Sequence, residues 1–490
     1  MGFVLTLRDE EESVDFLSME YQLADGGLEI SIPEQREVWG GDSIFAQGEQ
    51  LVQASFGNRE AVVLFSVTGV TRDELIQNVA RIDRILERAK RRSIEERGTR
   101  VELVYAWDQT ANTTYYEVVS GRLEWPQNTM SVEQVHQKKD DRWIIADFTV
   151  TLVLYPFAYP VSPVSGSAQP VKLSNVHGSD QTESVVHNRN DSTHDNFVEI
   201  KANQLPGAYP LPLTITLKGD SGEAEKIGKV YIGVRQGDLG FTPILEDNAA
   251  EFRIGNVGST SDPDYSSGGT YSNLVNTVTD PGAHPPINPA VLARWSLSDA
   301  QMDKTQGAFR IFGKVRDGFY WDPNANYCLA VTYQGVTLHQ TEWRTPLDTT
   351  ISLFDFGTVF LPPWLGSNQG LAGLKIELKI WRKTYGTSTI KLDYLALLPQ
   401  DGGYRVIQYR GAGLGQLEYV IDDGWGKAVY HVTSTGKRSG LPFALMPPLT
   451  LKPGQTQRVY FLMEGINGSS EISRRLKVSV GVVPTYMVLA

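Results

Sequence analysis

The N-terminal fold is decided by residues 60–92, which read EAVVLFSVTGVTRDELIQNVARIDRILERAKRR. Residues 61–68 are rich in valine, leucine and phenylalanine, which predicts a strand, and Gly69 interrupts it. Thr71 and Glu74 have the spacing of a capping box, in which a hydroxyl and a carboxylate accept hydrogen bonds from N–H groups that a helix leaves free. The sequence therefore predicts a strand, a one-glycine break and a helix that begins at Thr71.

The predicted helix has one apolar face. At helical spacing this face carries Leu75, Val79, Ile82, Leu86 and Ala89, and the opposite face carries Gln77, Arg81, Arg84 and Arg88. An apolar face of this length must pack on other apolar residues, and strands are predicted at 101–106, 115–119 and 148–155. We expect one helix packed against a β-sandwich, with the helix as an assembly element.

Composition limits the class of protein. A chain of 490 residues is long enough for two to four domains, and its 41% hydrophobic and 21% charged residues are ordinary for a globular protein. The net charge of −12 argues against nucleic-acid binding as the main role. Cys328 is the single cysteine, so no internal disulfide forms. No signal peptide and no 18-residue apolar run is present, which predicts synthesis in a cytoplasm without a membrane anchor.

The rest of the first domain is predicted from shorter patterns. Residues 1–60 should form strands with exposed arms or loops, and the acidic run at 9–12 should be a solvated face. Residues 141–155 predict a long strand with Phe148, Val150, Leu152 and Leu154 on one face. The proline-rich stretch at 156–170 marks the domain boundary, so the first domain is placed at 1–160.

The remaining chain is predicted to form two more β-sandwiches. Strands at 374–380 and 390–394 alternate apolar and charged residues, which indicates one buried and one wet face each, and the block 240–400 should be a jelly-roll-like sandwich of two sheets. Residues 161–239 and 401–490 each supply few strands. We therefore expect these two segments to form one sandwich that carries the 240–400 block as an insertion.

No pattern for catalysis, a cofactor or a metal site stands out. Nucleophile elbows, phosphate-binding loops and paired cysteine motifs are absent, and no spacing singles out a pair of carboxylates for glycoside hydrolysis. His177, His187 and His194 lack the spacing of zinc ligands and should be exposed loop residues. We predict that the chain is not an enzyme.

Aromatic residues are dense between 295 and 400 and leave two interpretations open. Trp321, Trp343 and Trp364 could stack on sugar rings, whereas a tryptophan of a sandwich is more commonly a core residue. Trp364 follows two prolines and precedes Gly366 by two residues, so it is the best candidate for an exposed ring on a loop.

The order of these elements resembles a known family. The strand at 61–68, the TRDELI helix, and the strands that contain VELVY, YYEVVSGRLE and FTVTLVLYP resemble the N-terminal domain of the distal tail proteins of long-tailed phages. That family is related in fold to tail-tube and baseplate-hub subunits. The resemblance covers residues 1–160 well, and residues 161–239 with 401–490 loosely.

The resemblance implies a fold and a function. The fold would be mainly β: a tail-tube-like sandwich with one packed helix, followed by a galectin-like sandwich that carries the inserted jelly-roll. The protein would be a virion component, made in the host cytoplasm, that forms a homo-hexameric ring at the tail tip and contacts the tail-tube protein and the tip or hub proteins. DNA would pass through the ring, and the basic helix face would meet an acidic neighbouring copy. The alternative is a carbohydrate-binding or carbohydrate-cleaving adhesion protein, acting on a host-surface glycan through the 240–400 block.

Overall fold

The computed structural model is mainly β and divides into two compact units, described here one at a time. It describes residues 3–40, 50–95, 99–107, 113–126, 138–139, 141–159, 162, 171–176, 182–191, 193–205, 210–220, 226–237, 244–278, 282, 285, 289–297, 305–362, 374–409, 413–415, 418–424, 428–439, 442–466, 468 and 470–482. Unit 1 holds the described residues up to 162, and unit 2 holds those from 171 to 482. The expected fold class, β-sandwiches with one helix, is confirmed.

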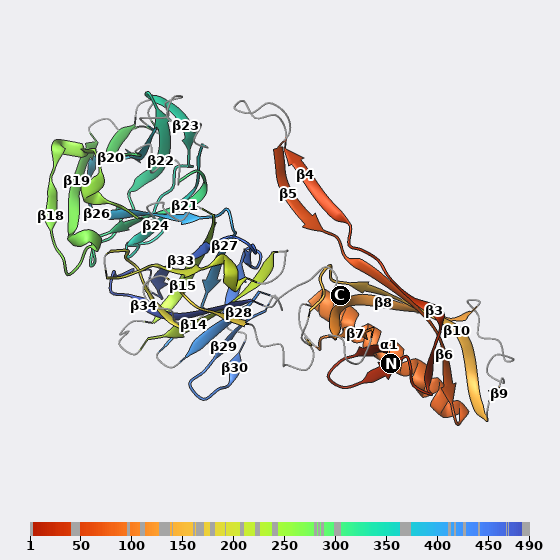
Figure 1. Ribbon diagram of the computed structural model, residues 1–490. Coiled ribbons are helices and arrows are strands. Elements are labelled where there is room, and N and C mark those ends of the chain that lie inside the picture. Colours follow the sequence, from red (N-terminus) through yellow and green to blue (C-terminus); the bar gives the residue numbers. More distant parts are fainter. Residues whose placement is uncertain are drawn as a thin grey trace. The chain divides into compact units, whose positions relative to one another are not determined.

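Unit 1 is an eight-stranded sheet with one helix (Figure 1). In chain order its elements are β1 Val4–Arg8, β2 Ser13–Asp15, β3 Tyr21–Ile30, β4 Gln35–Gly40, β5 Gln50–Phe56, β6 Arg59–Gly69, α1 Arg72–Glu95, β7 Glu102–Ala106, β8 Thr114–Glu124, β9 Lys138–Lys139 and β10 Arg142–Leu154. The sheet order is β2-β1-β7-β8-β10-β6-β3, with β9 on β10, and β4 pairs with β5 separately.

Strand β8 connects two halves of this sheet. Its first residues, from Thr114 to Glu117, pair with β7, and its later residues, from Val118 to Glu124, pair with β10. Core residues from both halves join one cluster with the helix, for example Leu7 of β1, Phe65 of β6 and Ile82 of α1. The halves therefore enclose a common core.

Helix α1 follows the prediction closely. Leu75, Val79, Ile82 and Leu86 are all buried, and Ile85 joins them. Thr71 Oγ1 accepts a hydrogen bond from the Glu74 N–H at 3.1 Å, while the Glu74 carboxylate accepts one from the Val70 N–H at 2.8 Å. The capping box thus forms, with the carboxylate reaching one residue further back than the motif implies.

A glycine allows the helix to lie close to the sheet. A Cβ on Gly121 of β8 would stand 2.6 Å from Leu86 Cδ2 of the helix and 2.9 Å from Leu152 Cδ2 of β10. Buried side chains of β10, at Phe148, Val150, Leu152 and Leu154, form the predicted apolar face beneath. This close approach is why β8 has a glycine in the middle of a strand.

Unit 2 contains a sandwich built from two separate chain segments. The first supplies β11 Val171–Leu173, β12 Ser184–His187, β13 Phe197–Ile200, the short helix η3 Ala202–Gln204, β14 Leu211–Gly219 and β15 Ile227–Gln236. The second supplies β27 Tyr404–Gln408, β28 Tyr419–Asp423, β29 Ala428–Val432, β30 Arg438–Ser439, β31 Phe443–Leu445, β32 Thr450–Leu451, β33 Gln457–Gly465 and β34 Arg475–Val482. The sheets β11-β34-β14-β28-β29-β30 and β13-β33-β15-β27-β31 both mix strands from the two segments. We call this part the two-segment sandwich.

A further sandwich lies in sequence between β15 and β27, and we call it the inserted sandwich. Its elements are β16 Ile244–Glu246, η4 Asp247–Ala249, β17 Phe252–Arg253, η5 Ile254–Asn256, β18 Ser259–Ser261, η6 Ser267–Gly269, β19 Thr270–Val278, β20 Ala290–Ser296, β21 Gly307–Val315, β22 Ala325–Tyr333, β23 Val336–Gln340, β24 Leu353–Leu361, β25 Leu374–Arg382 and β26 Gly386–Pro399. Its two sheets run β18-β19-β26-β21-β24, with β16 on β26, and β17-β20-β25-β22-β23.

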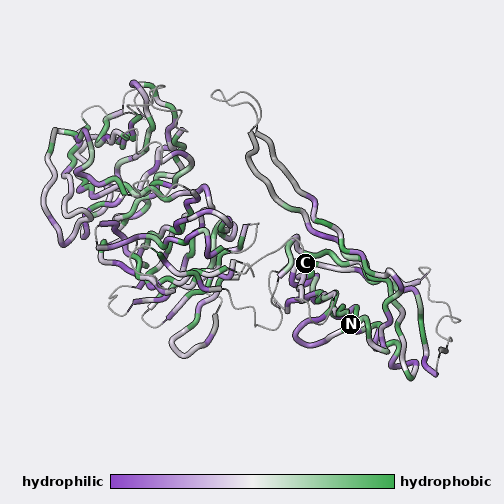
Figure 2. Tube along the Cα trace, in the orientation of Figure 1, coloured by the Kyte–Doolittle hydropathy of each residue, from purple (hydrophilic) through white to green (hydrophobic). Residues whose placement is uncertain are grey.

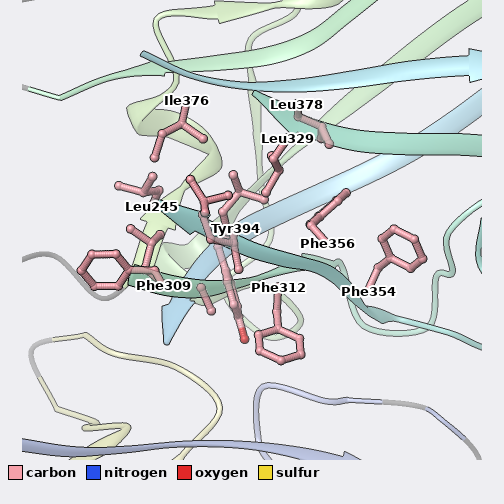
Figure 3. Close-up of a cluster of buried hydrophobic side chains, with 14 of the residues drawn as sticks. Leu245, Phe309, Phe312, Leu329, Phe354, Phe356, Ile376, Leu378 and Tyr394 are labelled. Atoms are coloured by element: carbon pink, nitrogen blue, oxygen red, sulfur yellow. The ribbon is translucent and has the colours of Figure 1, made fainter. Parts of the chain in front are cut away.

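One hydrophobic core extends from the inserted sandwich onto the two-segment sandwich. Figure 3 shows its centre around Phe309, Phe312 and Tyr394. Tyr231 of β15 belongs to the same cluster and packs on Phe312 with ring centroids 4.6 Å apart. Val230 and Ile232, the neighbours of Tyr231 along the strand, belong to the other core, inside the two-segment sandwich. The sheet that contains β15 is therefore covered on both faces, and consecutive buried residues mark β15 and β33. Figure 2 shows hydrophobic segments, in green, in both units.

The prediction that β25 and β26 each expose one face to water needs correction. Glu377 and Lys379 of β25 are buried, and Glu377 Oε1 accepts a hydrogen bond from Arg294 Nε at 2.7 Å. Asp393 of β26 is fully buried and accepts a hydrogen bond from the Ser267 N–H at 3.2 Å. Alternation of apolar and charged residues predicts that the charged ones face water. Here an ion pair with Arg294 covers Glu377, and the η6 segment covers Asp393.

Candidate functional site

The polar face of α1 is paired with the N-terminal acidic run. Arg84 donates hydrogen bonds to Glu12, the shortest at 2.6 Å, and Arg88 pairs with both Asp9 and Glu12. Hydrogen bonds from Arg84, with help from Arg88 and against the effect of burial, lower the pKa of Glu12 to about 2. The expectation of a solvated acidic run holds for Glu10 and Glu11, which are exposed, and is wrong for Asp9, which is buried. Asp9 and Glu12 attach the segment after β1 to the helix.

This pairing gives the basic face of the helix acidic partners within one copy, while an acidic neighbouring copy stays a prediction. The acidic partner of Arg84 and Arg88 is the same chain, so these two arginines are already neutralised inside one copy. Arg81 is used internally as well, since its Nη1 lies 3.4 Å from the Tyr21 hydroxyl, which in turn donates to the Asn78 carbonyl at 3.0 Å. These arginines therefore make contacts within unit 1, and their role in assembly stays a prediction.

A two-stranded hairpin continues from the sheet of unit 1. β4 follows β3, β5 leads into β6, and the two pair in antiparallel register from Gln35 with Phe56 to Gly40 with Gln50. Figure 1 shows this hairpin extending away from the body of unit 1 as an arm. Next to it, β3 pairs with β6 on one side, and no pairing on its other side occurs within the described part of the chain. An arm and a sheet edge are two surfaces on which another chain can pair.

The three candidate tryptophans occupy different environments. Trp321 is only 1% exposed and its Nε1–H donates to the Gly313 carbonyl at 3.1 Å, so it is a core residue with no ring face open to a sugar. Trp343 is half-buried and packs edge to face on Trp381, with ring centroids 6.1 Å apart. Trp364 lies outside the described residues, as does His177 of the predicted loop histidines.

The other two predicted loop histidines lie together. The rings of His187 and His194 have centroids 4.6 Å apart, and His194 Nδ1 lies 2.9 Å from Asp191 Oδ1. His187 is half-buried rather than exposed, and burial, with the nearby His194 and Arg189, lowers its pKa to about 4. Among the described residues no group of three or more histidine, cysteine or acidic side chains is arranged to hold a metal ion.

A cavity of about 410 Å³ opens where the inserted sandwich meets the two-segment sandwich. The inserted sandwich lines it with Asp264, Tyr265, Arg316, Asp317, Gly318 and Phe319, and the segment before β34 adds Glu471 and Ser473. Arg316 lies among three rings, with its guanidinium carbon 4.9 Å from the centroid of Tyr265, 5.3 Å from Phe319 and 5.5 Å from Tyr271. Sequence reasoning missed this site, because its residues come from three loops without a shared motif.

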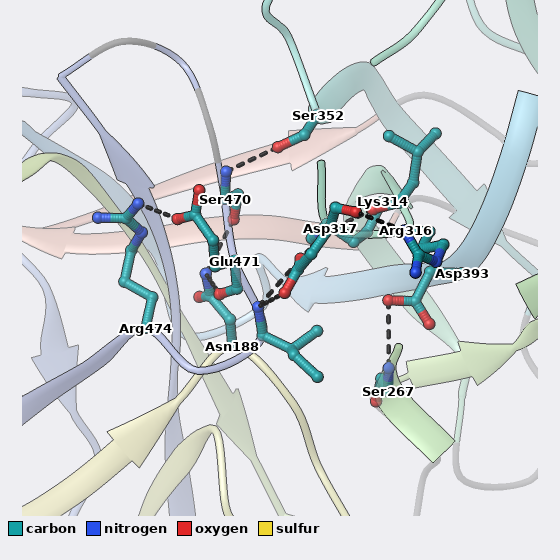
Figure 4. Close-up of polar contacts among 12 residues, drawn as sticks. Asn188, Ser267, Lys314, Arg316, Asp317, Ser352, Asp393, Ser470, Glu471 and Arg474 are labelled. Carbon is teal, nitrogen blue, oxygen red and sulfur yellow. Dashed lines mark hydrogen bonds and ion pairs between the residues drawn. The ribbon is translucent and has the colours of Figure 1, made fainter. Parts of the chain in front are cut away.

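Buried polar contacts fix the base of this cavity (Figure 4). Lys314 is fully buried, and its Nζ donates to Asp317 Oδ1 at 2.7 Å. The Asp317 carboxylate also accepts from the Ile472 N–H, at 3.1 Å to Oδ2. Nearby, Ser470 N donates to Ser352 Oγ at 2.6 Å. These bonds join the inserted sandwich to the segment that precedes β34.

Carboxyl groups under η6 are held in an apolar setting. Burial, together with the adjacent Asp247, raises the pKa of Glu246 to about 7, although a hydrogen bond from Ser267 opposes it. Burial raises the pKa of Asp393 as well, against the attraction of Lys314. Asp247 is satisfied differently, because Thr270 and Ser272 donate to its two oxygens at 2.7 Å each. The group is thus a set of buried acids and hydroxyls rather than an open site.

Comparison with known proteins gives structural matches only. No family model and no curated protein matches the chain. No helix among the described residues is long and apolar enough to cross a membrane.

Three of the matched structures are of phage proteins. One is the Dit protein of phage SPP1, described as a paradigm of the hub adsorption apparatus of phages that infect Gram-positive bacteria; it is 14% identical, the match covers 48% of this chain and 71% of that one, and the TM-score is 0.23. Others come from the baseplate of phage p2 in its activated conformation, with strontium (8% identity, 81% and 98% covered, TM-score 0.21) and with calcium (9%, 82% and 100%, 0.20). The solved structures that this chain resembles thus include a distal tail protein, the family whose element order its sequence resembles.

Proposed function

We propose that the chain is a structural protein of a phage tail tip, and that unit 1 assembles into a hexameric ring with copies of itself. The observation that carries this proposal is the combination in unit 1 of a packed core, an unpaired outer edge on β3 within the described residues, and the projecting β4–β5 arm. A sheet edge offers backbone N–H and C=O groups to a strand of a neighbour, which is an efficient way to join identical copies.

The proposal divides the chain into three domains. Residues 1–160 form the ring subunit, 161–239 with 401–490 form a galectin-like sandwich, and 240–400 form an inserted jelly-roll. Pairing of β14 with β34 and of β15 with β33 supports the two-segment domain, because each pair joins strands more than 200 residues apart. In the particle the ring contacts the tail-tube protein on one side and the tip or hub proteins on the other.

The same ring leaves a passage for DNA. The net charge of −12 supports this role, because a negative lining repels the phosphate backbone and keeps it from binding in transit. The internal pairing of Arg84 and Arg88 acts in the same direction, since it neutralises two positive charges of α1. The function needs no reaction and no cofactor.

Electron microscopy of the purified full chain tests the ring. We expect six-fold particles, and we expect monomers when residues 35–56, which contain the arm, are replaced by a short turn. A matched control replaces the turn 433–437 between β29 and β30 in unit 2, and it should leave the rings intact. A full chain that stays monomeric at every concentration, or that mass spectrometry fails to find in virions, would overturn the proposal.

A second function, binding of a host-surface glycan by the inserted sandwich, is favoured by exposed aromatic residues. Trp343 packs on Trp381, whose ring also lies 5.7 Å from Lys383 Nζ, and Tyr385 nearby in sequence is 72% exposed. Trp381 is itself buried, so the half-buried Trp343 and the exposed Tyr385 are the rings that can offer an apolar face to a sugar. A glycan array tests it: binding that Trp343→Ala or Trp364→Ala weakens would support the function, and no binding to any glycan would remove it.

A further inference from the structure

The cavity between the two sandwiches of unit 2 combines a free ring face with free polar groups. Tyr265 is half exposed, although one face of its ring contacts Arg316. Asp264 is exposed and makes no hydrogen bond or ion pair with any residue that the structure describes. Ser473, also exposed, faces the same space from the two-segment sandwich. Together they place an apolar surface beside a carboxylate and a hydroxyl.

The walls of the cavity are rigid. Arg316 is held by an ion pair with Asp262 and by a hydrogen bond from its Nη1 to the Asp317 carbonyl at 3.1 Å. Phe319, another residue of the lining, has Lys391 Nζ 3.7 Å from the centroid of its ring. The backbone is tied as well, because Asp317 N donates to the Tyr265 carbonyl at 3.0 Å. A preformed site of this kind binds a ligand without the cost of ordering loops.

The charges of the lining select against strongly charged ligands. The positive charge of Arg316 is balanced by Asp262, and Glu471 is paired with Arg474, so the carboxylate of Asp264 is the charge of the lining that repels an anion. A cationic ligand would need the rings of Tyr265 and Phe319 for stacking. The Arg316 guanidinium already lies against both rings. A neutral ligand with many hydroxyl groups has neither problem, because each hydroxyl can donate to a carboxylate or accept from the guanidinium.

We propose that this cavity binds one sugar residue of a neutral polysaccharide. The pyranose ring lies against Tyr265 and its hydroxyls donate to Asp264, while Arg316 and Ser473 donate to its oxygens. A volume of about 410 Å³ is at the small end of ligand sites and fits a short saccharide rather than a large cofactor. The proposal rests on the second function above, and it places the binding site at the joint of the sandwiches instead of at the tryptophans.

Saturation-transfer NMR on the full chain provides the test. The probes are the methyl glycosides of glucose, galactose, rhamnose and N-acetylglucosamine. We expect saturable binding of at least one probe and about tenfold weaker binding in both Tyr265→Ala and Asp264→Asn, since each variant removes a direct contact. Asp264→Asn keeps the shape of the side chain, so it reports on binding even if Tyr265→Ala disturbs the loop. Phe360→Ala, which removes an exposed ring of β24 outside the cavity, is the control and should bind normally.

The outcomes separate this proposal from the others. Binding that is unchanged in Tyr265→Ala and Asp264→Asn but lost in Trp343→Ala would overturn the cavity site and leave the glycan function in place. Absence of binding to every probe would overturn the cavity site, and a negative glycan array as well would remove the second function. Ring assembly, measured on the same preparations by electron microscopy, is independent of either result.

Discussion

Strands β10 of unit 1 and β33 of unit 2 are both central in their sheets, but their sequences differ. In β10 the buried residues Phe148, Val150, Leu152 and Leu154 alternate with residues that are partly exposed. In β33 the five residues from Val459 to Met463 are all buried. The difference reflects what covers each sheet: helix α1 and the facing half-sheet enclose one side of β10, whereas the two cores of unit 2 lie on opposite faces of β33. An alternating strand marks an outer layer, and a continuous apolar strand marks an inner one.

The largest expected effect on stability concerns the contacts between the two sandwiches of unit 2, whose packing makes β33 an inner strand. Asp317→Ala leaves the buried Lys314 ammonium without its carboxylate and the Ile472 N–H without its acceptor. We expect the free energy of unfolding of unit 2 to fall by about 3–5 kcal/mol, as when one partner of a buried ion pair is removed. Chemical denaturation followed by hydrogen exchange, resolved by unit, measures it. Asp264→Ala changes an exposed aspartate on another loop of the same cavity and should change stability by less than about 0.5 kcal/mol.

Unit 1 depends instead on its helix, and Ile82→Ala tests this dependence. Ile82 is fully buried between α1 and the sheet, so its truncation leaves a cavity and should cost about 2–4 kcal/mol in unit 1 alone. Ile76→Ala removes the same atoms from the exposed side of the helix and should have little effect. If unit 2 lost protection in Ile82→Ala to the same degree, the two cores would not be independent.

The two units should also respond to pH in opposite directions. Burial raises the pKa of Glu246 in unit 2 to about 7, so folding favours the protonated acid; its contribution is complete below pH 4.5 and is lost as the pH rises through 7. Hydrogen bonds from Arg84 lower the pKa of Glu12 in unit 1, so its contribution is present above pH 4.5 and is lost as the pH falls toward 2.

Glu246→Gln isolates the effect in unit 2. Glutamine does not ionise, so the variant should gain about 3 kcal/mol over the natural chain at pH 8 and have no such advantage at pH 4. Thermal unfolding at the two pH values measures the difference, with the exposed Glu342→Gln as control. Parallel pH curves for Glu246→Gln and the natural chain would show that this carboxylate is not the source of the dependence.

The sequence predicted those features that depend on local pattern. The capping residues and the apolar stripe of α1 identify the helix and its buried face, and the alternation in β10 identifies its core side. Contacts between distant segments could not be predicted in this way. Nothing in the local sequence indicates that Asp9 and Glu12 reach Arg88, or that the cavity combines Tyr265 with Ser473 across more than 200 residues. Charge alternation likewise does not distinguish a wet face from a paired and covered one, as Asp393 shows.

The smallest expected effect concerns the ion pairs on the outer side of α1. Arg88→Ala removes the partner of Asp9, whose side chain is fully buried, and should destabilise unit 1 by about 1 kcal/mol and loosen the segment between β1 and β2. Arg91→Ala breaks only the exposed pair with Glu87 and should cost less than about 0.5 kcal/mol. Hydrogen exchange of residues 9–15 distinguishes the two variants. If both arginines proved equally dispensable, the acidic run would not hold the edge of the sheet to the helix, and Arg88 would be free to meet a neighbouring copy in a ring.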